Sequence, residues 1–540
     1  MSPVRSVRTG LLVSTVLGVP FLLATPARAG LTLTPGDILI SSSTYEDQGA
    51  VTGLTVGSQI PTISTTALAV SGGAGVNDNP LGVFFNSTPD ANFGVTSPLT
   101  LTQYATTGAQ NGSLAFPAAT AIGANDGIVT SFSSKSEGSL TFSPNGQSVS
   151  LMGYSAPVGA LDVSNAQTPG ASEPGNTDIQ TPTYRSVATV NAVGNVTLTQ
   201  TNSFSGNNGR AAVLLPDNQT LLMIGNAGNG NGSNQVTNGT GVQFTQIGST
   251  PLTVPNGAPV QYGPGSTSVG FYAIGQNGYT ADKTAKDSNF RGLTIYNNTV
   301  YTTKGSGSNG IDSVYQVGNA GSLVTLPATS APVTGNSMAS NNPITILPGL
   351  STQLAKSPGP DFTPFSTWFA NSTTMYVSDE GSGNTTDVSQ HGGIDKYSLV
   401  NGTWELDYVL RGTLIGSTTD FTDYGDVTTT GLRQINGVVN ADGTVTIYGV
   451  TATTDNIAYD SATMDAGADP NEVVDITDAL NDTTLPTGED YSVFEPAELG
   501  TVYRGVAIDP VPEPASLVLL GTGLLGLGAL RRRSRRSPLF

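Results

Sequence analysis

The sequence predicts an all-β protein built from repeated four-stranded units. Two observations lead to this prediction: a strand–turn–strand motif recurs along the chain, and helical periodicity is nearly absent before the last thirty residues. Short runs rich in Val, Ile, Leu, Tyr and Phe are separated by turn residues such as Gly146, Asn298 and Gly443. This alternation is typical of strands and hairpins.

The motif is a strand, a tight turn and a second strand that leads into a loop rich in Gly and Asn. Five copies occur, at residues 138–153, 210–225, 291–303, 365–378 and 434–449. Each is followed by two more strand-like runs, for example residues 310–316 and 322–326 after the third copy. Four strands per unit is the arrangement of a β-propeller blade, although the spacing of roughly seventy to eighty residues exceeds that of common blades.

The two ends of the central domain supply a sixth copy. Residues 502–508 form an inner strand without a partner, and residues 36–42 form a second strand without an inner one. Pairing them closes the ring and leaves no exposed sheet edge. We therefore predict a β-propeller of six blades over residues 30–509, with seven as the alternative because residues 50–125 are hard to divide. A β-sandwich array or a β-solenoid would not use this pairing of the ends.

The first 29 residues predict a removable signal peptide. Arg5 and Arg8 form a basic start, and an apolar run over 11–24 leads to Ala27-Arg28-Ala29, a cleavage site of small residues. The apolar run is short for a membrane span. A retained N-terminal anchor is the alternative.

Residues 510–540 form a different kind of segment. Pro512, Glu513 and Pro514 precede an apolar, Gly- and Leu-rich run over 517–530, which we expect to form one C-terminal hydrophobic helix. A basic cluster follows at once, comprising Arg531, Arg532, Arg533, Arg535 and Arg536. Such a cluster lies on the cytoplasmic side of a membrane.

This tail resembles the PEP-CTERM sorting signal of Gram-negative, exopolysaccharide-producing bacteria. The resemblance covers only about thirty residues, but Pro-Glu-Pro, the apolar run and the Arg cluster occur in the order of that family. It implies that an exosortase, a membrane protease, removes the tail near Pro512. The protein would then contact the membrane only before processing and would end on the cell surface or be secreted.

Charge and cysteine content exclude several classes of function for the central domain. Residues 30–509 carry 38 acidic and 12 basic side chains, a formal charge of −26. That sign argues against a nucleic-acid partner, whose phosphates require a basic surface. The chain has no Cys, so disulfides, thiolate nucleophiles and thiolate metal ligands are excluded.

Signatures of catalysis are sparse. His391 is the only histidine and lies in a Gly-rich segment, which favours a polar turn over a triad. The Gly-x-Gly stretches are not placed between a strand and a helix, so they predict no phosphate loop. We predict no cofactor, with calcium as the one metal that the residues could bind.

Acidic clusters provide the candidate calcium ligands, because calcium takes oxygen ligands in flexible geometry. The first choice is the group Asp379, Glu380 and Asp387. Two further sets are Asp420, Asp423 and Asp426, and Asp465, Asp469 and Glu472. None has the regular spacing of an EF-hand loop.

A series of basic residues provides the candidate ligand site. Five of the six predicted inner strands begin at or near one, and only the strand at Phe365 lacks it; the five are Lys135, Arg210, Arg291, Arg433 and Arg504. If these strands share a register, the five residues converge at one mouth of the channel. Guanidinium groups bind carboxylate, sulfate and phosphate bidentately. The structural alternative is that each residue pairs with an acidic residue of the neighbouring blade.

These features lead to one function hypothesis and two alternatives. We expect a non-enzymatic surface or matrix protein that binds, or is embedded in, extracellular polysaccharide. One alternative is a propeller enzyme that hydrolyses a glycan or an ester, with or without calcium, since two carboxylates suffice for glycoside chemistry. The other is an adhesin or scaffold with protein partners.

Overall fold

The computed structural model describes the central domain. The described residues are 30–44, 96–131, 134–135, 137–160, 163–164, 166–169, 181–228, 239–250, 269–271, 287–307, 309–324, 343–356, 362–383, 392–421, 425–455, 469–498 and 500–510. All secondary-structure elements named within these ranges are β-strands. Within the same ranges, no helix is long and apolar enough to cross a membrane. The predicted signal peptide, the C-terminal hydrophobic helix and the sorting residues lie outside the described residues.

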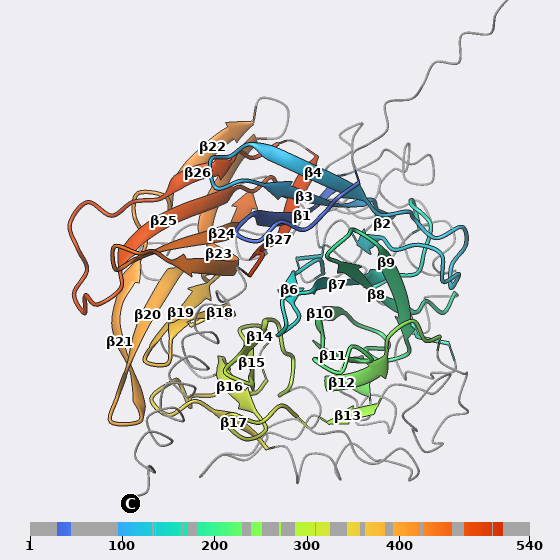
Figure 1. The fold of residues 1–540 in the computed structure, drawn as a ribbon, viewed down its shortest axis with the longest axis horizontal. Coiled ribbons are helices and arrows are strands. Elements are labelled where there is room, and N and C mark those ends of the chain that lie inside the picture. The colour runs from blue at the N-terminus through green and yellow to red at the C-terminus, as the bar shows by residue number, and fades with distance from the viewer. Residues whose placement is uncertain are drawn as a thin grey trace, which may run out of the picture.

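Six sheets surround a common axis, each with its first strand nearest the centre (Figure 1). Blade 1 contains β27 (Thr501–Ile508), β1 (Ile38–Thr44), β3 (Leu99–Tyr104) and β4 (Gln110–Ala115). Blade 2 contains β6 (Thr141–Phe142), β7 (Ser148–Tyr154), β8 (Arg185–Asn191) and β9 (Val196–Thr201). Blade 3 contains β10 (Gly209–Leu214), β11 (Thr220–Gly225), β12 (Gly241–Gln246) and β13 (Val269–Phe271).

The second half of the ring repeats this order. Blade 4 contains β14 (Leu293–Tyr296), β15 (Thr299–Lys304), β16 (Ser313–Val317) and β17 (Ile344–Ile346). Blade 5 contains β18 (Pro364–Asn371), β19 (Thr374–Asp379), β20 (Gly393–Val400) and β21 (Thr403–Leu410). Blade 6 contains β23 (Gly425–Val439), β24 (Thr444–Asp455), β25 (Val473–Ala479) and β26 (Ser492–Glu495), with β22 (Thr418–Phe421) beside the start of β23. A separate pair is formed by β2 (Thr96–Ser97) and β5 (Thr130–Ser131).

The prediction of a six-bladed propeller is confirmed, and all five internal hairpins are those expected from the sequence. One strand was misplaced: the fourth strand of blade 4 is β17, and residues 322–324, the described part of the predicted run 322–326, belong to no strand. Val324 lies in the apolar cluster between blades 3 and 4 but belongs to no strand. The apolar side chain of Val324 is therefore explained by burial and not by strand pairing.

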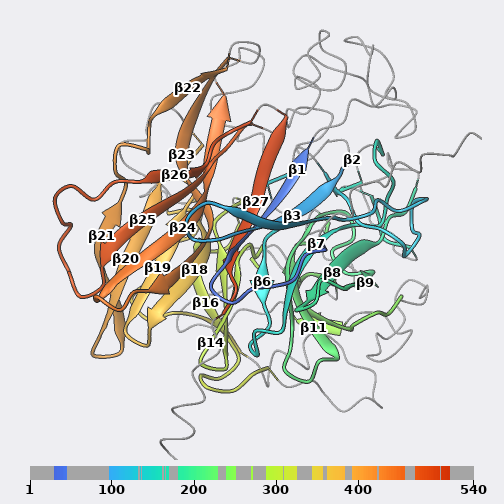
Figure 2. The same ribbon diagram turned by 45° about the horizontal axis from the view of Figure 1, so that its top comes forward.

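The two ends of the domain close the ring, as predicted. Strands β27 and β1 pair antiparallel from Ile38↔Ile508 to Thr44↔Thr501, with a register shift between Ser41 and Ser42. They lie side by side in both ribbon views (Figures 1 and 2). Blade 1 therefore takes its inner strand from one end of the domain and its other three strands from the opposite end.

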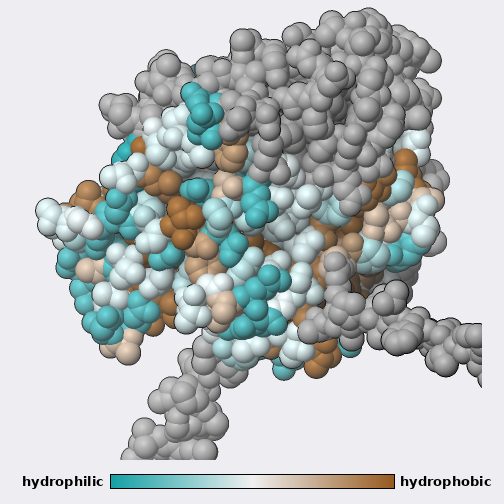
Figure 3. All heavy atoms as spheres, turned by 90° about the horizontal axis from the view of Figure 1, so that it is seen from above, coloured by the Kyte–Doolittle hydropathy of each residue, from teal (hydrophilic) through white to brown (hydrophobic). Residues whose placement is uncertain are grey.

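The core consists of one apolar cluster at each of the six interfaces between neighbouring blades. Side chains alternate between the two faces of a strand, so one strand serves two interfaces. In β11, Leu221 and Met223 pack toward blade 2, whereas Leu222 and Ile224 pack toward blade 4. The described surface seen in Figure 3 is mixed, with hydrophobic residues scattered among hydrophilic ones.

A side chain from blade 6 crosses the central channel. The Gln434 amide accepts a hydrogen bond from Leu140 N at 2.8 Å and donates one to Leu140 O in blade 2. It passes Gly505 of β27, where a Cβ would lie 2.4 Å from the Gln434 Oε1 atom. This bridge separates a polar end of the channel, where the inner strands begin, from an apolar end, where they finish.

The interface between blades 5 and 6 contains a fully buried ion pair. Lys396 Nζ lies 2.8 Å from Asp478 Oδ2, and both side chains have no exposed surface. Tyr376 and Tyr408 donate to the same carboxylate at 2.5 and 2.6 Å, and Lys396 also donates to Ala479 O at 2.6 Å. The hydrogen bonds satisfy both charges, which is the condition for burying an ion pair.

We predict that Lys396→Met lowers the free energy of unfolding by about 3–5 kcal/mol, because it leaves Asp478 charged and buried without its cation. Chemical denaturation monitored by fluorescence would measure the change. The matched control is Lys356→Met, at an exposed lysine. A loss no larger than that of the control would show that Asp478 does not need this partner.

Candidate functional site

The five predicted basic residues surround the polar end of the channel. Arg210, Arg433 and Arg504 lie on the inner strands β10, β23 and β27, and Arg291 and Lys135 lie just before β14 and β6. The four arginines are 3–5% exposed, and the Lys135 side chain is 21% exposed. The residues come from blades 2, 3, 4, 6 and 1.

Blade 5, which lacks a basic residue here, supplies a carboxylate instead. Glu380 directly follows β19, and its Oε2 atom lies 2.9 Å from Lys135 Nζ and 3.8 Å from Arg433 Nε. Lys135 belongs to blade 2, three blades away, so this ion pair spans the channel. Glu380 thus joins two of the predicted basic residues.

Arg210 and Arg291 are close enough to repel each other. Arg210 Nη1 donates to Phe290 O at 2.8 Å and to Asn289 O at 3.2 Å, while its buried Nε has no hydrogen-bond partner among the described residues. Burial, followed by the charge of Arg291, lowers the pKa of Arg210 well below its usual value. An anion bound between the two guanidinium groups would offset both effects.

Arg291 and Arg504 also contact neutral groups. Arg291 Nε donates to Ser306 Oγ at 2.8 Å, and its guanidinium lies 5.4 Å from the centre of the Phe365 ring. Arg504 donates to Ser43 Oγ at 2.8 Å and to Ser134 O, next to Lys135. A second carboxylate, Glu137, accepts from Tyr154 and Asn208 at 2.5 Å. Glu137 and Glu380 both lie close enough to Arg210 to interact with its charge.

The candidate calcium ligands have other partners where they are described. Asp379 Oδ1 accepts from Thr363 N at 3.3 Å, from Thr363 Oγ1 and from Gly381 N at 2.8 Å. Glu380 faces Lys135 and Arg433. In the described part of the chain, no three acidic or histidine side chains are grouped as metal ligands. Calcium binding stays a prediction, because Asp387, Asp423, Asp465 and His391 lie outside the described residues.

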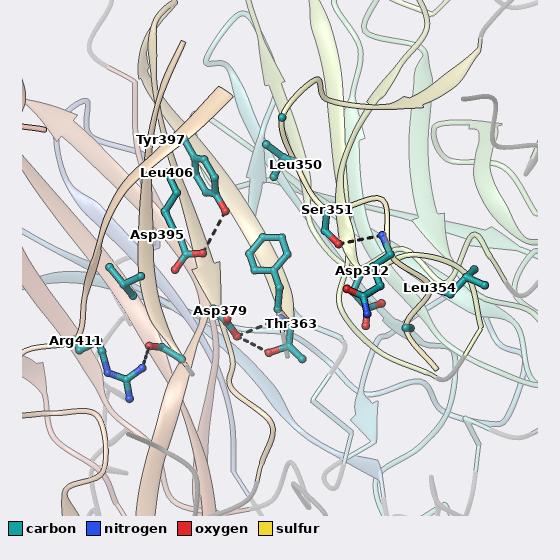
Figure 4. Close-up of a pocket in the computed structure, with 16 residues that line it drawn as sticks. Asp312, Leu350, Ser351, Leu354, Thr363, Asp379, Asp395, Tyr397, Leu406 and Arg411 are labelled. Carbon is teal, nitrogen blue, oxygen red and sulfur yellow. Dashed lines mark hydrogen bonds between the residues drawn. The ribbon is translucent and has the colours of Figure 1, made fainter. Parts of the chain in front are cut away.

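The sequence did not single out a pocket between blades 4 and 5 (Figure 4). Its volume is about 370 Å³, and its walls include Asp312, Phe362, Asp379, Asp395, Tyr397 and Arg411. Burial and the neighbouring Asp379 raise the pKa of Asp395 well above its usual value. The sequence offers one signal for this pocket. Asp395 directly follows the buried Ile394 in β20, so a charged side chain lies on a strand that is buried on both faces.

A wider cavity of about 710 Å³ lies at the other end of the channel. Aromatic and apolar side chains from the ends of the inner strands line it, including Phe142, Tyr296, Trp368, Val438 and Ile508. Amide groups of Asn436 and Asn440 add polar atoms. The two ends of the channel thus differ in chemistry, one basic and one aromatic.

We predict that Glu380→Gln lowers the free energy of unfolding by about 3 kcal/mol, because Lys135 and Arg433 lose their shared counterion. Because a bound anion would replace that counterion, sulfate should raise the melting temperature of this variant more than that of the wild type. Thermal unfolding with sulfate and with chloride at equal ionic strength would measure both effects, with Glu405→Gln on β21 as the exposed control. Equal sulfate responses would show that no anion replaces Glu380.

Comparisons with known proteins give one sequence match and distant structural ones. No curated protein matches the chain. A crystal structure of a protein from Lactobacillus plantarum is 10% identical over 88% of this chain and 99% of its own, with a TM-score of 0.30. An inulosucrase from Halalkalicoccus jeotgali bound to kestose is 10% identical over 69% and 89%, with a TM-score of 0.27.

An ulvan lyase, described as a new family of polysaccharide lyase and bound to -[GlcA(1-4)Rha3S]-, is 10% identical over 85% of this chain and 98% of its own, with a TM-score of 0.26. In sequence, residues 510–533 match the PEP-CTERM protein-sorting motif. The motif indicates an exported protein that an exosortase processes. The chain thus carries a PEP-CTERM sorting motif behind a six-bladed propeller.

Proposed function

We propose that this exported propeller binds acidic extracellular polysaccharide, and that the basic residues at the polar end of the channel recognise its carboxylate or sulfate groups. One observation carries the proposal: the buried Arg210 Nε has no partner among the described residues and lies close to the like charge of Arg291. Buried donors without partners are rare in proteins, and they cost free energy. An oxyanion would supply the missing acceptor.

The structural alternative accounts for only part of the cluster. Lys135 and Arg433 do have a carboxylate, Glu380. Arg210 instead donates only to backbone carbonyl oxygens within the described part. Interblade ion pairs therefore explain the contacts of Lys135 and Arg433, but they do not supply an acceptor for the buried Nε atom of Arg210.

Net charge does not oppose this proposal at physiological salt. The domain carries −26 overall, yet 5 of its 12 basic residues gather in this one place. The Debye length is about 8 Å at physiological ionic strength, so the acidic surface is screened beyond that distance. Short-range guanidinium contacts then decide which groups bind.

The aromatic end of the channel, which the Gln434 bridge separates from the basic end, offers a second surface that suits a glycan. Trp368, Tyr296 and Phe142 line a cavity large enough for a small ligand. Aromatic faces suit the apolar faces of sugar rings, and Asn436 and Asn440 offer hydrogen bonds.

We predict that the double variant Arg210→Gln/Arg291→Gln binds the extracellular polysaccharide of the producing bacterium at least tenfold more weakly, because each charge-assisted hydrogen bond contributes about 1.5–3 kcal/mol. Isothermal titration of residues 30–509, with and without calcium, would measure the affinity, and Lys356→Gln is the control. Absence of binding by the wild type would rule out the proposal. Loss of folding in the double variant, without binding by the wild type, would support the purely structural role.

We predict that the mature protein ends near Pro512, because the sorting motif directs removal of the tail. Mass spectrometry of the C-terminal peptide from the native protein would test this. A C-terminal peptide that retains Arg531 to Arg533 would show that processing does not occur.

A further inference from the structure

The pocket between blades 4 and 5 holds two buried carboxyl groups on adjacent strands (Figure 4). Asp379 ends β19 and Asp395 lies on β20, where the register pairs Val377 with Asp395 and Asp379 with Gly393. The two aspartates are thus diagonal neighbours on one face of the sheet, a relation that places Cα atoms about 7–8 Å apart and Cβ atoms somewhat closer. Both side chains line the pocket although they are only 5–6% exposed.

Hydrogen bonding makes the two carboxyl groups chemically different. Asp379 Oδ1 accepts three hydrogen bonds, two from Thr363 and one from Gly381. Asp395 accepts one, from Tyr397 Oη to Oδ2 at 3.3 Å. Burial raises the pKa of Asp379, but its hydrogen bonds from Thr363 and Gly381 lower it, whereas burial and the charge of Asp379 raise the pKa of Asp395 well above its usual value. Asp379 is therefore the more readily ionised of the two, and Asp395 is the more readily protonated.

We propose that Asp395 and Asp379 form an acid–base pair that hydrolyses a glycosidic bond of an acidic polysaccharide in this pocket. Asp395 is the general acid and Asp379 is the general base. This role goes beyond the recognition of anions at the channel, since it uses a different pocket and different residues. It rests on the proposed polysaccharide ligand only for the choice of substrate.

The charges around Asp395 support this division of roles. Asp379 on β19 and burial raise the pKa of Asp395, whereas Tyr397 on β20 and Arg411 after β21 lower it by smaller amounts. Tyr491 also interacts with Asp395, and Asp312 of blade 4 faces the same pocket. Two carboxyl groups whose environments separate their pKa values are the usual arrangement of an acid and a base.

The pocket walls match a sugar with an anionic group. Phe362 and Leu350 provide apolar surface, and Leu406 is 51% exposed at the pocket although it is a large hydrophobic residue. Arg411 donates to Gly392 O at 2.9 Å and adds a positive charge to the wall. A guanidinium at this place favours a uronate or sulfated residue.

The reaction consumes one water molecule. Asp395 donates its proton to the glycosidic oxygen while the bond between that oxygen and the anomeric carbon breaks. Asp379 accepts a proton from water as the water oxygen bonds to the anomeric carbon. A proton then returns from Asp379 to Asp395 through solvent, so no other reactant is needed.

The test uses the full exported protein and the extracellular polysaccharide of the producing bacterium in water enriched in ¹⁸O. We expect new reducing ends that contain one ¹⁸O atom, and an Asp395→Asn variant that releases them at least a hundredfold more slowly. Glu405→Gln on the outer strand of the same blade is the control and should keep full activity. Binding measured in parallel should be unchanged in Asp395→Asn, which separates this proposal from recognition at Arg210 and Arg291.

Three results would overturn the proposal: no reducing ends from the wild type, full activity of Asp395→Asn, or unsaturated products without ¹⁸O. If Asp395→Asn does not fold, Tyr397→Phe replaces it. That variant removes the one hydrogen bond that stabilises the Asp395 carboxylate, so the loss of activity at high pH should move to still higher pH. An unchanged pH profile would exclude Asp395 as the acid.

Discussion

The pairing of β27 with β1 is the constraint on which the rest of the structure depends. It joins residues more than 450 positions apart and gives blade 1 its inner strand. Without it, the interfaces of blade 1 with blades 2 and 6 would lose the apolar residues of β27, such as Ala507 and Val506. Because every blade packs only on its two neighbours, an open ring would expose two apolar faces. Closure also fixes Arg504 at the channel, so the same contact holds the fold and one part of the candidate site.

Closure of the ring brings together charged residues that are far apart in the sequence. The five basic residues of the channel are spread from position 135 to position 504, and only the ring brings them around one axis. Glu380 lies among them because blade 5 stands opposite blade 2, where Lys135 is. The Arg210–Arg291 side has no equivalent carboxylate contact for Arg210. A closed ring therefore produces an uneven charge distribution that a flat array of the same sheets would not have.

The sequence was sufficient to predict the hairpins, the number of blades and the pairing of the ends, because alternation and turn residues are local signals. It was not sufficient to assign individual carboxylates. Asp379 ends β19 and Glu380 directly follows it, yet the two side chains have different partners. Asp379 accepts hydrogen bonds from Thr363, whereas Glu380 pairs with Lys135 at the channel. Asp395 was missed because its partner lies sixteen residues away and is reached only through the register of β19 and β20.

Both candidate sites contain a buried charged group that tightly packed neighbouring residues hold in place. A propeller blade is packed on both faces, so an acidic or basic residue on one of its first three strands has little water around it. Its protonation state or its need for a counterion then depends on burial and on one or two contacts, such as Asp379 beside Asp395 or Glu380 beside Lys135. The fully buried pair of Lys396 and Asp478 shows the satisfied case, in which two tyrosines and a backbone carbonyl complete the contacts. Arg210 is the opposite case, because its buried Nε has no acceptor among the described protein groups, and Asp395 has one long hydrogen bond of 3.3 Å from Tyr397. This difference separates a structural charge from one available to a ligand.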